Sequence, residues 1–176
     1  EDFGIHMPDV EVKKWARYDA NGAFVHLKGR GDWLSVILVE VPPGAKTSPQ
    51  QHLFEEVVYV LSGHGSTSIE TSDGKKRSFE WGQGSLFALP LNAKYQHFNG
   101  SGREPARLAS TNNLPMVMNV FHNDKFVFEN PFRFPEREGG EDYFSGEGLF
   151  IPKRPGRHMW ETNFVPDLST FTAKFI

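Results

Sequence analysis

Short apolar and β-branched segments recur every eight to twelve residues between positions 32 and 122, with Gly or Pro in most of the gaps. Such segments are typical of antiparallel sandwiches and barrels. No long stretch here has helical periodicity, so we predict an all-β fold. The predicted strands are residues 32–41, 56–63, 65–71, 76–81, 85–90, 94–99, 106–113 and 115–122.

Alternation along these strands predicts which side chains face the interior. Glu56 alternates with two valines in residues 56–63. Tyr95, His97 and Asn99 alternate in the same way along residues 94–99. Because successive side chains of a strand point to opposite faces, each set should share one face. We therefore expect polar groups inside the barrel.

Composition excludes several classes of protein. The net charge is −3, and acidic and basic residues are mixed along the chain, so we expect no nucleic-acid face and no membrane surface. No apolar run approaches the ~18 residues of a membrane span. The chain has no cysteine, which excludes disulfides, thiolate nucleophiles and cysteine-based metal sites and suits a cytoplasmic protein.

Residues 123–176 differ from the rest, because they are rich in Pro and Gly but also aromatic. Disordered tails are poor in aromatics, so we expect an ordered, mostly irregular arm. It should pack against a second barrel or a twofold mate, and the alternative is that it folds back over its own barrel. The aromatics are Phe126, Phe128, Phe132, Phe134, Tyr143, Phe144, Phe150, Trp160, Phe164, Phe171 and Phe175.

The ends of the chain suggest further organisation. Residues 1–31 are mixed, and we assign them to lead-in strands. The chain opens without a methionine and stops at an apolar segment, so we expect it to be a piece of a longer protein.

Two blocks of residues carry a family resemblance. The first places Gly44, Gln50, His52, Glu56 and Gly63 at a fixed spacing, and the second does so for Gly84, Pro90, Asn92, Tyr95 and Asn99. Both blocks resemble the paired motifs of the cupin superfamily. The resemblance implies a double-stranded β-helix, a jelly-roll barrel, over residues 32–122. It also suggests the N-terminal half of a protein with two such barrels, a bicupin.

The resemblance further implies a metal site of three histidines and one glutamate. Gln50 and Tyr95 occupy the first and last histidine positions, whereas His52 and Glu56 are retained. His97 lies one inward step, roughly 6–7 Å, from Tyr95. His52, Glu56 and His97 would form a two-histidine, one-carboxylate set that suits non-haem iron or manganese. A Tyr95 phenolate is a costly alternative ligand, and Gln50 is a weak neutral donor.

Each of these residues also has a structural interpretation. His52 can be a hydrogen-bonded interior histidine, and His97 a polar core residue. A carboxylate inside a barrel is costly unless it is paired or bonded to a metal. Glu56 would then pair with His52, Tyr95 or Gln50.

Three functions follow as hypotheses. The barrel binds a small polar molecule through Gln50, His52, Tyr95 and His97, or it is the metal-free half of a bicupin. Alternatively, it is an iron- or manganese-dependent, dioxygenase-like oxidoreductase that uses His52, Glu56 and His97. We favour the first two, because two ligand positions are replaced. The expected partners are a small polar molecule and either a second copy of the chain or a second cupin domain.

Overall fold

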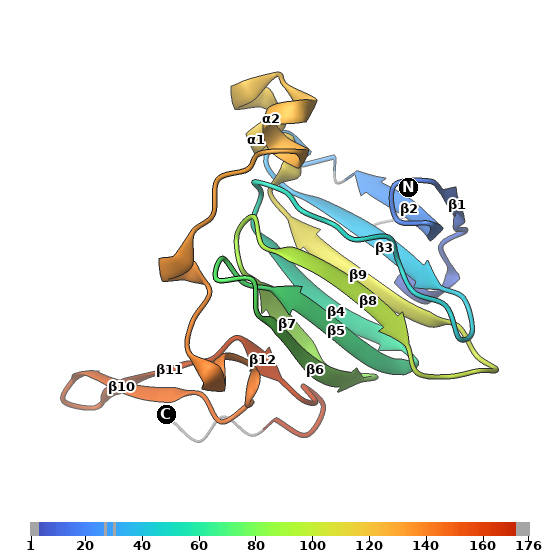
Figure 1. Cartoon of the computed structure of the whole chain (residues 1–176). Coiled ribbons are helices and arrows are strands. Elements are labelled where there is room, and N and C mark those ends of the chain that lie inside the picture. Colours follow the sequence, from blue (N-terminus) through green and yellow to red (C-terminus); the bar gives the residue numbers. More distant parts are fainter. Residues whose placement is uncertain (1–3, 27, 30, 172–176) are drawn as a thin grey trace.

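Two antiparallel sheets form the body of the molecule (Figure 1). The computed structural model describes residues 4–26, 28–29 and 31–171, with only the backbone described for Glu141 and His158. Within these residues, the first sheet has the order β1-β2-β3-β9-β4-β7-β12 and the second β6-β5-β8. The strands of the first sheet are β1 Lys13–Trp15, β2 Ala20–His26, β3 Ser35–Val41, β4 Glu56–Ser62, β7 Leu86–Leu89, β9 Ala106–Asn112 and β12 Phe164–Val165. Those of the second are β5 His64–Glu70, β6 Lys76–Gly82 and β8 Lys94–Asn99.

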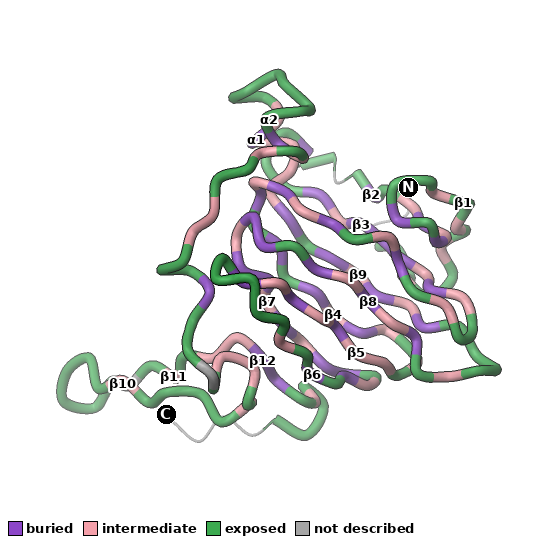
Figure 2. The backbone as a smooth tube through the Cα atoms, in the orientation of Figure 1, coloured by how far each residue is buried: buried purple, intermediate pink, exposed green. Residues whose placement is uncertain are grey.

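The core lies between the two sheets and follows the predicted alternation. Glu56, Val58 and Val60 are all buried on β4, whereas Val57 between them is 42% exposed. Purple therefore alternates with other colours along the barrel strands in Figure 2. Burying each large apolar side chain contributes about 1.5–3 kcal/mol. The predicted all-β jelly-roll fold is confirmed.

The loop between β3 and β4 extends the smaller sheet. Its residues run antiparallel to β8, with isolated bridges from Lys46 to Phe98 and from Gln50 to Tyr95. The backbones of Gln50 and Tyr95 exchange two N–H···O bonds of 2.8 and 2.9 Å. This pairing carries His52 to the end of the barrel where β4 begins.

The strand predicted at residues 115–122 is wrong. Leu114–Phe121 form helix α1, and Asp124–Phe128 form the short helix α2. Pro115 occupies the first turn of α1, where its missing N–H costs nothing. The apolar residues at 114, 117, 118 and 121 have helical spacing, which places Val117 in a small core with Phe54 and Val127.

The arm that follows α2 has little regular structure. It contains 3₁₀ turns at Pro135–Arg137 and Glu141–Phe144, a hairpin of β10 Leu149–Arg154 and β11 Arg157–Glu161, and the strand β12. A further 3₁₀ turn, Met7–Asp9, lies near the N-terminus.

Part of the arm packs on its own barrel. β12 pairs with β7, and Phe164 of β12 belongs to the core. Phe144 stacks on the core residue Phe79 with ring centroids 4.1 Å apart. This agrees with the alternative in which the arm folds back over its own barrel, whereas packing on a mate stays a prediction. Phe175 lies outside the described residues. None of the helices in the described ranges has the length and apolar character needed to cross a membrane.

Candidate functional site

A buried polar cluster lies at the end of the barrel where β4 and β8 begin. His52 comes from the β3–β4 loop, Glu56 opens β4, and Tyr95 lies on β8. Glu56 Oε2 is 2.9 Å from His52 Nε2 and accepts a 2.8 Å bond from the Tyr95 hydroxyl. His52 Nε2 and the Tyr95 hydroxyl are 3.0 Å apart. The three residues are at most 5% exposed, so they interact away from bulk water.

Hydrogen bonds fix the positions of His52 and Glu56. His52 Nδ1 lies 3.0 Å from the backbone carbonyl of Phe54, while Nε2 faces the carboxylate of Glu56. Both ring nitrogens therefore have hydrogen-bond partners inside the barrel. Burial raises the pKa of Glu56, but the hydrogen bond and charge of His52, with hydrogen bonds from Ser110 and Tyr95, outweigh it and lower that pKa to about 2.

Tyr95 enters this cluster as a phenol. Burial, followed by the negative charge of Glu56, raises the pKa of Tyr95 well above 10. Tyr18, from the turn between β1 and β2, hydrogen-bonds Tyr95, and burial raises its pKa as well. The protonated Tyr95 hydroxyl can therefore donate to Glu56, which contributes to the stability of the buried carboxylate.

His97 belongs to a separate hydrogen-bonded chain. Trp81 Nε1 donates to Thr67 Oγ1 over 2.8 Å, and Thr67 Oγ1 lies 2.7 Å from His97 Nδ1. The Thr67 hydroxyl therefore links the Trp81 indole to the His97 ring. Burial lowers the pKa of His97 to about 4, although the charge of Glu56 acts in the opposite direction. His97 is therefore a neutral core residue at neutral pH.

The side chain of Gln50 bonds to groups outside the cluster. Its side-chain Nε2 donates to the backbone carbonyl of Arg17 over 2.8 Å and to Ser48 Oγ over 3.0 Å. Gln50 thus fastens the β3–β4 loop to the turn that carries Tyr18. The structure therefore brings together His52, Glu56 and Tyr95 of the predicted site, and places Gln50 and His97 in other hydrogen-bonded groups.

An aromatic cap covers His52. The Phe54 ring stacks on the imidazole with centroids 3.6 Å apart and an angle of 6° between the planes. Phe128 of α2 packs edge-on against Phe54 at 5.9 Å, and the Arg17 guanidinium lies 3.8 Å above the Phe128 ring. Helices α1 and α2 stand over this end of the barrel in Figure 1. The cap therefore separates His52 from solvent.

Two surface cavities reach residues of the site region. One of about 310 Å³ is lined by Arg17, Pro49, Gln50, Gln51, Lys94, Phe128 and Glu129. The other, of about 330 Å³, is lined by Leu34, Glu55, Glu56, Val57, Ala88, Thr111, Asn112 and Asn113. The second lies on the outer face of the larger sheet, because Val57, Ala88 and Thr111 pair across β4, β7 and β9 on the face opposite to the Glu56 side chain.

The arrangement of these side chains does not fit a metal ion. His52 Nε2 is occupied by Glu56, Tyr95 is held as a phenol, and His97 Nδ1 is bonded to Thr67. In the described ranges, no three or more His, Asp or Glu side chains are grouped so that they could hold a metal ion. Two ligand side chains that bond each other are an incomplete shell. The iron or manganese set of His52, Glu56 and His97 stays a prediction for metal analysis.

Sequence reasoning missed three residues of this site. Ser110 alternates with Asn112 along β9, so its inward face was predictable from period two. Phe54 lies two residues from His52, but nothing local indicates that the two rings stack. Tyr18 lies in the lead-in region, far before Tyr95 in the sequence, and no sequence signal joins the two.

Comparison with known proteins gives one related sequence and several related folds. The chain is 33% identical over 108 residues to L-ectoine synthase of Bordetella petrii, a match that covers 61% of this chain and 77% of that protein. No family model matches the chain.

Two solved structures show the shared fold. The cupin domain of Schizosaccharomyces pombe Cnp3 matches with a TM-score of 0.53 and 18% identity, covering 69% of this chain and 85% of that one. Oxalate decarboxylase of Lactobacillus farciminis, solved as a formate complex, matches with a TM-score of 0.53 and 19% identity, covering 68% of this chain. The matched part spans 40% of the decarboxylase chain.

Proposed function

Because this chain belongs to the cupin superfamily, we propose that it binds a small polar molecule, without a metal ion, at the barrel end that holds His52, Glu56 and Tyr95. The observation that supports this most is their mutual hydrogen bonding, with every bond 3.0 Å or shorter. A carboxylate that is satisfied by an imidazole and a phenol needs no metal to be stable inside a barrel.

The chemistry of the cluster defines the kind of ligand. Glu56 offers a carboxylate that stays ionised, and His52 and Tyr95 offer an N–H and an O–H beside it. A molecule that carries both a hydrogen-bond donor and an acceptor can replace each hydrogen bond between these side chains with one of its own. This favours amino acids, hydroxy acids and similarly compact polar molecules.

The test is ligand binding by the purified chain and by variants of the cluster. The probes are amino acids, hydroxy acids and L-ectoine, chosen because the related protein is named as a synthase of L-ectoine. Glu56→Gln and Tyr95→Phe should weaken binding measured by titration calorimetry. Tyr59→Phe is the matched control, because Tyr59 pairs with Leu86 and Ala109 and alternates with the inward valines of β4. Equal binding by all four proteins, or no binding by the wild type, contradicts the proposal.

The same barrel can serve as the metal-free half of a two-barrel protein. In that arrangement this half binds the small molecule, and the chemistry takes place in the other half. The support is the replacement of two ligand positions by Gln50 and Tyr95 together with the retained fold. Supplying the second barrel should then add activity without changing the affinity measured above.

An enzyme is the second candidate function. Its support is the 33% identity to a protein named as a synthase. The form expected from the sequence is an iron- or manganese-dependent, dioxygenase-like oxidoreductase on His52, Glu56 and His97. We rank it below binding, because the donors of the cluster are bonded to each other and a shared fold does not fix a function.

A further inference from the structure

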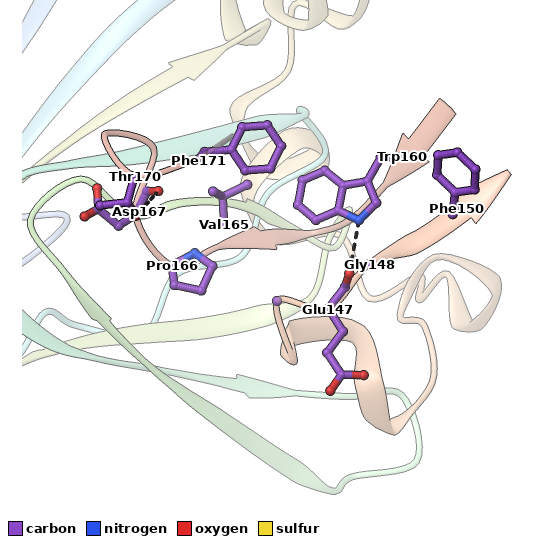
Figure 3. A pocket seen from close by; sticks show the side chains of 10 residues that line it. Glu147, Gly148, Phe150, Trp160, Val165, Pro166, Asp167, Thr170 and Phe171 are labelled. Atoms are coloured by element: carbon purple, nitrogen blue, oxygen red, sulfur yellow. Dashed lines mark hydrogen bonds between the residues drawn. The ribbon is translucent and has the colours of Figure 1, made fainter. Parts of the chain in front are cut away.

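A cavity of about 640 Å³ lies on the arm, between the β10–β11 hairpin and the segment that follows β12. Three aromatic side chains line it: Phe150 and Trp160, which are opposite each other in the hairpin register, and Phe171. The Trp160 and Phe171 rings stack with their centroids 4.9 Å apart, and Figure 3 shows both rings at the cavity. Its volume is typical of small-molecule sites. The arm therefore carries an aromatic cavity of a size that suits a ligand.

The backbone beside the hairpin holds the Trp160 ring in place. Trp160 Nε1 donates to the backbone carbonyl of Glu147 over 3.0 Å. Gly148 lies directly against the same ring, because a Cβ at this position would come within 2.3 Å of Nε1. Gly148 also has a φ of +66°, a conformation that side chains other than glycine rarely adopt. The aromatic wall is therefore built before any ligand binds.

The opposite wall of the cavity is attached to the barrel. It is formed by the segment 165–171, whose first residue belongs to β12 and so pairs with β7. Leu168 N–H donates to the carbonyl of Gly84 over 2.8 Å, and Ser85 Oγ donates to the carbonyl of Pro166 over 2.5 Å. This wall is thus fixed to the turn between β6 and β7.

The charge around the cavity is negative. Figure 3 shows the carboxylates of Glu147 and Asp167 on different sides of it. The hydroxyl and the backbone N–H of Ser169 donate hydrogen bonds to Asp167, which lower the pKa of that carboxyl. A neighbouring cavity of about 410 Å³ shares Glu147 and is also lined by Asp142 and Glu161. No Lys or Arg is found among the described residues that line either cavity, so a cation is the favoured occupant.

Hydrogen bonding indicates which kind of cation fits. The Trp160 N–H already has its acceptor, Asp167 Oδ1 accepts twice from Ser169, and the Thr170 hydroxyl donates to the Asp167 carbonyl over 3.3 Å. A primary ammonium or a guanidinium among the rings would leave N–H donors unsatisfied. A quaternary ammonium has no N–H donor and presents only methyl groups to the aromatic faces.

We propose that this cavity binds a small quaternary ammonium compound. Its methyl groups would contact the rings of Trp160 and Phe171, and the carboxylates of Glu147 and Asp167 would balance its charge. Tryptophan is the strongest aromatic partner of a cation, and quaternary ammonium groups are ligands that aromatic sites recognise. The site goes beyond the function proposed above and does not depend on it, because its residues lie on the arm and not at the barrel end.

Binding of choline to the full chain tests the proposal. The measurement is titration calorimetry with choline and with the uncharged alcohol in which a carbon atom replaces the nitrogen of choline. The two molecules have the same shape, so the comparison isolates the charge. Choline should bind at least about tenfold more tightly than its uncharged analogue. If the barrel end binds no small polar molecule, this result is unaffected.

Two substitutions locate the site. Trp160→Leu removes an aromatic face and should weaken choline binding by about tenfold. Glu147→Gln should weaken it by about threefold, since Glu147 is exposed and its charge is screened. Trp33→Leu, at a 57% exposed ring before β3, and Glu104→Gln, at an exposed position in the β8–β9 loop, are the matched controls and should bind choline as the wild type does. Glu147→Gln keeps the size of an exposed side chain, so it tests the site without disturbing the hairpin.

Three results would each overturn the proposal. The first is a wild type that does not bind choline. The second is equal affinity for choline and its uncharged analogue. The third is a choline affinity that is unchanged in both Trp160→Leu and Glu147→Gln.

Discussion

His97 should make the fold sensitive to mild acid. This ring is 3% exposed, and burial lowers its pKa from 6.5 to about 4. The negative charge of Glu56 acts in the opposite direction and recovers only part of that loss. As the pH falls, the unfolded chain therefore takes up a proton at this ring before the folded chain does. The stability associated with a neutral His97 is fully present above pH 6.5. As the pH falls from 6.5 to about 4, the free energy of unfolding decreases.

The size of the effect follows from the two pKa values. Between about pH 7 and pH 5, this ring should lower the free energy of unfolding by about 2 kcal/mol. Urea unfolding at several pH values across this interval measures it. His97→Gln cannot titrate, so it should be less stable than the wild type at neutral pH but lose much less stability on acidification. His64→Gln, at an exposed position on β5, should retain the wild-type loss. An equal loss in His97→Gln and the wild type would refute the reasoning.

Three further substitutions test the barrel end and the arm. Glu56→Gln should lower the free energy of unfolding by about 3 kcal/mol at neutral pH, measured with urea, because it removes the charge that faces His52. The folded pKa of Glu56 lies below its ordinary 4.5, so the difference in stability between the wild type and Glu56→Gln should shrink as the pH falls from 4.5 toward 2. Phe54→Ala should cost about 3–5 kcal/mol because the ring is buried, whereas Phe24→Ala at a 48% exposed ring should cost much less. Asn92→Gly is compatible with the left-handed backbone at this position (φ 55°) but removes two side-chain hydrogen bonds to the carbonyls of Asn130 and Phe132. Limited proteolysis near residues 123–134 should therefore become faster. An unchanged cleavage rate would contradict the role of Asn92 in holding this segment.

Local patterns predicted much of the fold. Period-two alternation gave the buried faces of β4 and β8, and the Gly and Pro positions gave the turns between strands. The failure at Leu114–Phe121 has a clear cause. A short apolar run with a β-branched residue suits a strand as well as a buried helix. The competing signals were Pro115, which suits a first helical turn, and the spacing of Leu114, Val117 and Phe121.

The candidate site was less predictable, because its geometry depends on contacts between distant residues. Alternation placed Tyr95 and His97 inside, and both are buried. It could not show that Thr67, 30 residues away, would bond to His97, or that Tyr95 would bond to Tyr18. The position of Gln50 was predicted from spacing, but its bond to the Arg17 carbonyl depends on how the lead-in strands fold.

Metal analysis of the purified full chain tests the central claim most directly. The account holds that His52, Glu56 and Tyr95 satisfy one another by hydrogen bonding and that the described residues leave no set of donors for a metal. Elemental analysis after dialysis should therefore find far less than one metal ion per chain, with the same content in Glu56→Gln. Iron or manganese close to one per chain in the wild type, lost in Glu56→Gln, would contradict the account and favour a metal-dependent enzyme.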